Sequence, residues 1–183
     1  MVTTYGLARR VLHPLLHPLA SQARRLRTAA LTAHVRSQAG SVAGPLRVNG
    51  WSSVSAQTHL GRNVHFNGLI VSGSGAVTIG DNFHSGPGCL FITQFHNYDA
   101  GTALPYDETV ILKPIVIGDN VWLGSRVIIL GGVTIGEGAV IQAGSCVVTD
   151  IPRCAIAGGH PAKVFRSRDI EHYERLKAAG RFL

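Results

Sequence analysis

IGDNVWLGSRVIILGGVTIGEGAVIQAGSCV, residues 117–147, is the stretch that decides the fold. Every sixth residue in it is aliphatic: Ile117, Leu123, Ile129, Ile135, Ile141 and Val147. A period of six fits neither the stripe of an amphipathic helix nor the alternation of a half-buried strand. It is typical of a repeat that turns a corner after each short strand and points one side chain inward. Three hexads make one triangular coil, so the sequence predicts a parallel β-helix in which Ile117 stacks on Ile135, Leu123 on Ile141 and Ile129 on Val147.

A looser block precedes this stretch. Leu60, Phe66 and Ser72 keep the spacing of six, and Ile79 follows after one inserted residue. The phrase Ile-Gly-Asp-Asn occurs in both blocks, at 79–82 and at 117–120. Residues 94–114 hold no hexad and are rich in Gly, Pro, Asn and Asp, which predicts a loop extruded between two coils. Loops on a rigid scaffold often carry function.

The charge of the chain is uneven along its length. No Asp or Glu precedes Asp81, whereas eight arginines lie between Arg9 and Arg62. We divide the chain into a basic N-terminal extension (1–50), a solenoid domain (51–166) and a short C-terminal helix (167–183), and place a basic helix at Ser21 to Ala39. The extension is interpreted as a cap over the open end of the solenoid. Peripheral contact of residues 1–45 with the inner face of an anionic membrane and an organelle transit peptide are the alternatives.

Composition excludes several other classes of protein. The sequence has no run of 18 uninterrupted apolar residues, which argues against a transmembrane span. The basic N-terminal segment has no interleaved aromatic residues and no recognisable nucleic-acid-binding motif, so we expect no nucleic-acid partner. Cys89, Cys146 and Cys154 are odd in number and have no metal-type spacing, which indicates reduced thiols in the cytoplasm and no metal centre.

Residues 60–166 resemble the hexapeptide-repeat acyltransferases, in particular the maltose and galactoside O-acetyltransferase branch and the surface-polysaccharide O-acetyltransferases. Three motifs carry the resemblance: Ile-Gly-Asp-Asn-Val-Trp-Leu-Gly-Ser at 117–125, Gly-Val-Thr-Ile-Gly-Glu-Gly-Ala-Val-Ile at 132–141, and Ala-Gly-Gly-His-Pro-Ala-Lys-Val-Phe-Arg at 157–166. The resemblance implies a left-handed β-helix, a homotrimer with active sites between subunits, and acetyl-CoA as the acyl donor. It also implies a hydroxyl acceptor on a carbohydrate, which we expect among surface glycans or their precursors.

His96 is the expected catalytic residue, because it occupies the position of the family's catalytic histidine at the start of the extruded loop. Transfer of an acyl group to an alcohol needs a base, and histidine exchanges protons near neutral pH. We predict direct attack in a ternary complex, since no Ser or Cys lies in a recognisable nucleophile motif. Asp99, Asp107, Glu108 or a backbone carbonyl could orient the imidazole, and Asp99 is our candidate.

The resemblance assigns the remaining site residues by position. Trp122, Ser125, Ala143, Lys163 and Arg166 match coenzyme-contacting or neighbouring positions, and Asn67 matches an asparagine that contacts the acceptor. Gly73 and Ser74 replace an acidic pair of the galactoside enzymes, which argues against galactoside or maltose as the acceptor. Val148-Thr149 replaces a Thr-Lys pair before Asp150, which weakens phosphate contact there.

Other functions remain open on the same fold. Serine and xenobiotic acetyltransferases would share the donor site and differ in the acceptor. A zinc-dependent carbonic anhydrase of the γ class needs three histidines around one metal ion. His65 and His84 fall one coil apart, and His59 lies further along what we take to be the same edge. A solenoid that only scaffolds an assembly is the last alternative, against which the presence of His96 and the 157–166 motif argues.

Overall fold

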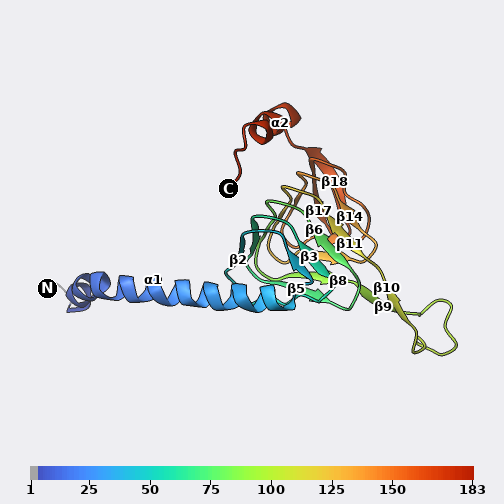
Figure 1. Cartoon of the computed structure of the whole chain (residues 1–183), viewed down its shortest axis with the longest axis horizontal. Helices are drawn as coiled ribbons and strands as arrows, with labels where there is room; N and C mark the ends of the chain where they lie inside the picture. Colours follow the sequence, from blue (N-terminus) through green and yellow to red (C-terminus); the bar gives the residue numbers. More distant parts are fainter. Residues whose placement is uncertain (1–3) are drawn as a thin grey trace.

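The computed structural model describes the backbone of residues 4–183 and the side chains from residue 20 onward. A long helix, α1 (Thr4–Gln38), leads into a triangular β-solenoid, and a short helix, α2 (Ile170–Ala178), follows it (Figure 1). α1 begins at Thr4, well before Ser21, where we placed its start. Neither helix has the length of apolar sequence that crossing a bilayer requires, as far as the described residues extend.

The solenoid has three faces of mainly parallel strands. Face A consists of β1 (Ser41–Val42), β3 (Thr58–Leu60), β6 (Val77–Ile79), β11 (Ile115–Ile117) and β14 (Thr134–Ile135). Face B consists of β2 (Leu46–Val48), β4 (Val64–Phe66), β7 (His84–Ser85), β12 (Trp122–Leu123), β15 (Val140–Ile141), β17 (Ala155–Gly159) and β18 (Ala162–Ser167). Face C consists of β5 (Leu69–Ser72), β8 (Cys89–Ile92), β13 (Ile128–Leu130) and β16 (Cys146–Val147).

The predicted stacking of the hexads is confirmed. Ile117 pairs with Ile135 on face A, Leu123 with Ile141 on face B, and Ile129 with Val147 on face C. All six side chains are buried in one continuous core that fills the prism. Burial of a Leu or Ile side chain contributes about 1.5–3 kcal/mol, so each of these stacked residues stabilises the solenoid.

The first coils differ from the prediction in two ways. The solenoid begins at Ser41, because β1 and β2 already pair with the next coil, inside the segment that we assigned to the extension. In the second coil Val71, and not Ser72, takes the inward place and stacks beside Phe91. Gly68, at φ +130°, tightens the corner before β5 and advances the strand by one residue.

A column of asparagines marks the corner between faces A and B. Asn63, Asn82 and Asn120 all adopt the left-handed conformation, at φ 55°, 55° and 58°, which asparagine tolerates better than most residues. Asn63 Nδ2 donates to Asn82 Oδ1 at 3.0 Å, and Asn82 Nδ2 donates to Asn120 Oδ1 at 2.9 Å. The repeated Ile-Gly-Asp-Asn phrase therefore encodes both the inward isoleucine and the amide that links neighbouring coils.

The last turns of α1 cover the open end of the first coil. Val35 is fully buried, the backbone N–H of Val48 donates to Thr32 Oγ1 at 3.0 Å, and that of Val54 donates to Gln38 Oε1 at 3.2 Å. The rings of His34 and Trp51 stack with centroids 4.9 Å apart. These contacts satisfy backbone donors that no preceding coil could pair.

At the other end of the solenoid, β18 runs antiparallel to β17 and extends face B, and α2 then packs beside the corner of faces A and B. Asp169 caps α2 by accepting a hydrogen bond from the backbone N–H of His172 at 2.9 Å. Tyr173 is the buried residue of this helix. Its hydroxyl accepts a hydrogen bond from Asn120 Nδ2 at 2.9 Å and donates one to Glu137 Oε1 at 2.7 Å. The helix is thereby joined to the end of the asparagine column.

The segment predicted to leave the solenoid does so as a two-stranded ribbon. β9 (Gln94–His96) and β10 (Val110–Leu112) pair antiparallel and project from the corner between faces C and A (Figure 1). β6 and β11, the face A strands before and after this excursion, still pair directly. The three cysteines are buried free thiols, as the sequence predicts.

Candidate active site

His96 is the last residue of β9, opposite Val110 on β10, and its side chain is exposed. The imidazole stacks on the ring of Tyr106 from the loop, with centroids 3.9 Å apart and an interplanar angle of 15°. The strand pairing fixes the backbone and the stack fixes the plane of the ring. The imidazole is therefore held on the surface of the ribbon, where a substrate could reach it.

The imidazole borders hollows on both sides of the ribbon. One, of about 290 Å³, lies between the ribbon and the corner of faces C and A, where Asp99, Lys113 and Val148 also line it. Lys113 lies 5.4 Å from the centroid of the Phe95 ring, which places a cation on this wall. The other is more open and is lined by the loop residues Tyr106, Asp107 and Glu108.

The candidates for orienting the imidazole have different environments. Asp107 accepts hydrogen bonds from the backbone N–H groups of Thr109 at 2.9 Å and Thr102 at 3.1 Å, and from Asn97 Nδ2 at 3.3 Å. These bonds hold the pKa of its carboxyl below the ordinary value. They also tie Asp107 to three other residues of the loop, so its role there is structural. Asp99 shares a wall with His96. Throughout the described part of the chain, no carboxylate is hydrogen-bonded to the imidazole, so Asp99 stays a prediction.

The candidate donor residues follow face B and its corner with face C. Trp122 lies on the outer side of β12 and is 57% exposed. Ser125 and Ala143 occupy the corner after face B in successive coils, where Gly124 allows close stacking, since a Cβ there would lie 2.5 Å from the Ala143 nitrogen. Lys163 and Arg166 are exposed on β18, opposite Gly158 and Ile156.

Asn67 lies at the same corner, two coils before Ser125. Its Nδ2 donates to the backbone oxygen of Ser85 at 2.7 Å, and its Oδ1 accepts from Asn49 Nδ2 at 3.0 Å. The amide thus links three coils, which is a structural role that does not require an acceptor. One amide N–H and the exposed position leave room for a substrate contact as well.

One chain does not unite the predicted residues. His96 and Asp99 project from the corner of faces C and A, whereas Trp122, Ser125 and Ala143 belong to face B and to the corner of faces B and C. The ribbon projects from the corner opposite face B, so it points away from the outer surface of that face. Within one chain, these two sets of predicted residues therefore stay apart.

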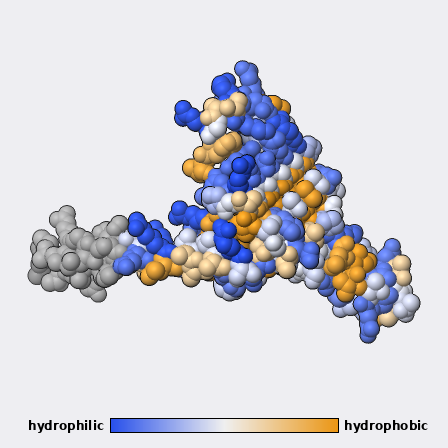
Figure 2. Space-filling model, viewed as in Figure 1, coloured by the Kyte–Doolittle hydropathy of each residue, from blue (hydrophilic) through white to orange (hydrophobic). Residues whose placement is uncertain are grey.

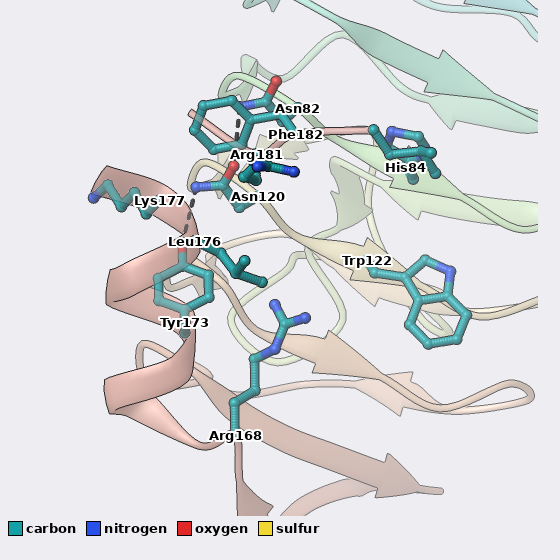
Figure 3. Close-up of a pocket in the computed structure, with 11 residues that line it drawn as sticks. Asn82, His84, Asn120, Trp122, Arg168, Tyr173, Leu176, Lys177, Arg181 and Phe182 are labelled. Carbon is teal, nitrogen blue, oxygen red and sulfur yellow. Dashed lines mark hydrogen bonds between the residues drawn. The ribbon is translucent and has the colours of Figure 1, made fainter. Parts of the chain in front are cut away.

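The structure also shows a pocket that the sequence did not reveal. It has a volume of about 340 Å³ and lies between face B and α2 with its tail (Figure 3). Its lining includes the following residues: Asn82, His84, Asn120, Trp122, Arg168, Tyr173, Leu176, Lys177, Arg181, Phe182 and Leu183. The only sequence signal for it is the repeated Ile-Gly-Asp-Asn phrase, which supplies Asn82 and Asn120.

The surroundings shift the pKa values of two ionisable groups in the pocket, Tyr173 and His84. Burial raises the pKa of Tyr173 to about 12, helped by its hydrogen bond to Glu137. Burial also lowers the pKa of His84, whose ring lies 4.3 Å from that of His65. His65 has a pKa lowered by burial and by the charge of His84. Both imidazoles are therefore biased towards the neutral form.

The histidines do not assemble the set that a carbonic anhydrase needs. His59 belongs to β3 on face A, where its Nδ1 is 2.9 Å from Ser41 Oγ, whereas His65 and His84 pair on face B. Our placement of all three on one edge was wrong, because the step from 59 to 65 crosses a corner. Among the residues whose side chains are described, no group of three His, Cys, Asp or Glu side chains could hold a metal ion.

The fold has close counterparts among known proteins. Residues 114–149 match the family "Bacterial transferase hexapeptide (six repeats)". The crystal structure of the hexapeptide-repeat acetyltransferase VCA0836 from Vibrio cholerae superposes with a TM-score of 0.66 and 31% identity, over 83% of this chain and 92% of that one. The chain belongs to the hexapeptide-repeat acetyltransferases.

Three further comparisons agree with this family. Galactoside O-acetyltransferase of Escherichia coli (strain K12) is 39% identical over 125 residues, which are 66% of this chain and 61% of that protein. A crystal structure of galactoside acetyltransferase in complex with coenzyme A superposes with a TM-score of 0.59 and 30% identity, over 82% of this chain and 84% of that one. VCA0836 has also been solved in complex with acetyl coenzyme A, with a TM-score of 0.58 and 28% identity, over 80% of this chain and 87% of that one. The chain spans less than two thirds of the length of its E. coli relative.

Proposed function

We propose that this chain is an O-acetyltransferase that moves an acetyl group from acetyl-CoA to a hydroxyl of a carbohydrate. His96 acts as the general base. Its neutral imidazole takes the proton of the hydroxyl as the oxygen attacks the thioester carbonyl. The tetrahedral intermediate then expels the thiolate of coenzyme A, which takes the proton back from the imidazolium. The acetyl ester and free thiol are the products, and no acyl-enzyme forms.

The observation that carries this proposal is the exposure of His96 on a ribbon that holds its ring in place. A general base must reach the hydroxyl directly, and it must keep its orientation between turnovers. The stack on Tyr106 at 3.9 Å serves the second requirement. The family membership and the coenzyme A complexes of similar proteins support acetyl-CoA as the donor.

We assign the donor to the groove that follows face B. The pantetheine arm would pass Trp122, Ser125 and Ala143, which follow one another across face B and along its corner with face C. Lys163 and Arg166 on β18 would meet the phosphates, since both are exposed cations at the end of this line. Asn67, at the corner of faces B and C, would contact the end of the acceptor that lies next to the donor.

The site is completed by a second copy of the chain, in a homotrimer. His96 and Trp122 lie on different sides of one prism, so the ribbon of a neighbour has to supply the base. The ribbon carries apolar surface (Figure 2), and Val110 and Leu112 on β10 are each 50% exposed. Exposed apolar residues on a projecting element are typical of a surface that another subunit covers.

The activity is tested by the release of free thiol from acetyl-CoA against a panel of sugars, nucleotide sugars, amino acids and aminoglycosides. His96→Ala should lower turnover about 100-fold or more, which is the contribution of a general base, while coenzyme A binding stays nearly unchanged. His172→Ala, on the exposed surface of α2, is the matched control. An active His96→Ala enzyme would refute the assignment of the base. Thiol release with serine or aminoglycosides alone would move the acceptor away from carbohydrates.

The shared site is tested by mixing two inactive variants. His96→Ala and Trp122→Ala each disable one half of every site in their own homotrimers. When the two are co-expressed, about one quarter of the sites in randomly mixed trimers pair an intact ribbon with an intact groove. Activity should therefore return in the mixture. A mixture as inactive as its components would show that each chain builds its site alone.

We also propose peripheral contact of the N-terminal segment with the inner face of an anionic membrane. Arg24, Arg25 and Arg27 are exposed on α1, and basic residues near a membrane surface each contribute about 1 kcal/mol to binding. Truncation of residues 1–45 would remove Val35 and β1 from the solenoid, so charge reversal is the cleaner test. Arg24, Arg25 and Arg27 changed together to Glu should abolish co-sedimentation with phosphatidylserine vesicles. Unchanged co-sedimentation would leave α1 with its covering role alone.

A further inference from the structure

The pocket between face B and α2, here called the face B pocket, combines apolar walls with positive charge (Figure 3). We propose that it binds the acceptor, and that the acceptor is an anionic carbohydrate carrying a phosphate or a carboxylate group. The identity of the ligand as the acceptor rests on the proposed function. The class of ligand rests on the pocket itself.

The side chains of the pocket carry positive charge. Its lining holds Arg168, Lys177 and Arg181 but no Asp or Glu. Its anionic group is the carboxyl group of Leu183, which accepts from Asn63 Nδ2 at 2.7 Å. Lys177 is neutralised, because its Nζ lies 2.5 Å from Glu137 Oε1. Arg168 donates from Nη1 to the backbone oxygen of Gly138 at 3.2 Å and lies 5.3 Å from the centroid of the Tyr173 ring, so its charge meets only neutral groups. In the described structure, the guanidinium of Arg181 has no hydrogen bond or ion pair. Figure 3 shows the Arg168 side chain extending from the link between β18 and α2 towards the space beside Trp122.

The neighbouring carboxylates do not cancel this charge. Asp81 is bound to Arg62 at 2.7 Å and accepts the backbone N–H of Arg62. Asp119 accepts the backbone N–H of Asp81 at 2.7 Å. Neither lines the pocket. Two guanidinium groups beside a partly enclosed space of low polarity favour an anion, and guanidinium binds phosphate and carboxylate in a forked geometry.

The rest of the lining suits a sugar ring. Trp122, Leu176 and Phe182 are exposed by 57%, 40% and 49%, and they give the pocket flat aromatic and aliphatic walls for the C–H face of a ring. Asn82 and Asn120 each use one amide N–H in the asparagine column. The second N–H of each remains for a ligand hydroxyl. Ligand sites of this kind combine apolar walls with a few fixed polar groups.

The position of the pocket agrees with an acceptor site. Trp122 lies on β12 between Asn120, at the corner with face A, and Ser125, at the corner with face C. A ligand in the pocket would therefore meet the donor groove at Trp122, where the ribbon of the neighbouring copy would bring its His96. Donor, acceptor and base would converge on one side chain.

The test measures equilibrium binding without acetyl-CoA, by the fluorescence of Trp122 in a Trp51→Phe background, since the chain has two tryptophans. The probes are galactose 1-phosphate, galacturonate, galactose and inorganic phosphate at low ionic strength. At least one anionic sugar should bind tenfold or more tightly than galactose, and added salt should weaken it. The stronger of the two anionic probes identifies phosphate or carboxylate as the recognised group.

Variants connect that binding to the pocket. Arg181→Gln and Arg168→Gln should each weaken binding of the anionic sugar about 10- to 100-fold, in line with the value of a charge-assisted hydrogen bond. Arg175→Gln, which changes the same charge on α2 outside the pocket, should leave binding unchanged. Equal binding of galactose and its anionic forms, or equal losses in Arg181→Gln and Arg175→Gln, would overturn the inference. Inorganic phosphate that binds as tightly as galactose 1-phosphate would overturn its carbohydrate part.

The outcome is separable from that of the proposed function. Thiol release with a neutral acceptor, in a protein that binds no anionic sugar, would overturn the anionic acceptor and leave the transfer reaction in place. Binding of an anionic sugar without thiol release from acetyl-CoA would overturn the sugar as the acceptor and leave the ligand class of the pocket in place.

Discussion

Gly138→Ala should detach α2 from the solenoid. Gly138 has φ +71°, where alanine costs about 1–2 kcal/mol, and a Cβ there would lie 2.8 Å from Tyr173 Cζ. The ring would have to leave its place, and its hydrogen bonds to Asn120 and Glu137 would break, each worth about 1 kcal/mol. Together these effects lower the free energy of unfolding by about 3–4 kcal/mol.

The two contributions can be separated by denaturant titrations. Gly144→Ala is the matched control, because Gly144 has φ +73° but no atom within 4 Å of the Cβ position, so it should show only the backbone cost. In a Tyr173→Ala background the clash is gone, and the cost of Gly138→Ala should fall to that of Gly144→Ala. Limited proteolysis should meanwhile cut the tail of Gly138→Ala first. If Gly138→Ala costs the same with and without the tyrosine ring, the reasoning about this contact is refuted.

Two further predictions concern stability. Ser85→Ala should raise the free energy of unfolding by about 1 kcal/mol in urea titrations, because the buried Ser85 hydroxyl has no hydrogen-bond partner in the described structure; a loss of stability would contradict this. The folded-state pKa values of His65 and His84 are lowered by burial, so below about pH 6.5 the unfolded chain takes up protons more readily. The free energy of unfolding should therefore be highest above that pH, where both histidines are neutral in either state. It should decline as the pH falls towards their folded-state pKa values. The urea midpoint between pH 8 and 5 should follow this course, and it should flatten in a His65→Gln, His84→Gln double variant; an equally steep double variant would exclude the pair as its origin.

The hexad predicted the core well because the aliphatic residue of every hexad is buried, although the residue two places before it, such as Val121 or Val127, is buried as well. Ile117, Ile135 and their equivalents had to stack once the period was known. The first coil was missed although Val42, Val48 and Val54 have the same spacing. None of the three is followed by a glycine, as Ile79, Ile117 and Ile135 are, so their spacing alone did not reveal a coil.

The arrangement of the candidate site was harder to predict from the sequence than the core. The position of His96 followed from the break in the repeat, but the direction of the ribbon depends on the corner from which it leaves. That Trp122 points elsewhere could not be deduced from spacing alone. The bond between Asn120 and Tyr173 joins a coil to a helix that obeys a different period, so no repeat could predict it.

The direct pairing of β6 with β11 has an evolutionary consequence. The prism closes as if the intervening ribbon were absent, so its length and composition can change without any cost to the stacked core. The ribbon that carries His96 and the stacked core are thereby encoded in separate segments of the gene. Exchange of the ribbon between relatives should transplant reactivity onto an unaltered scaffold.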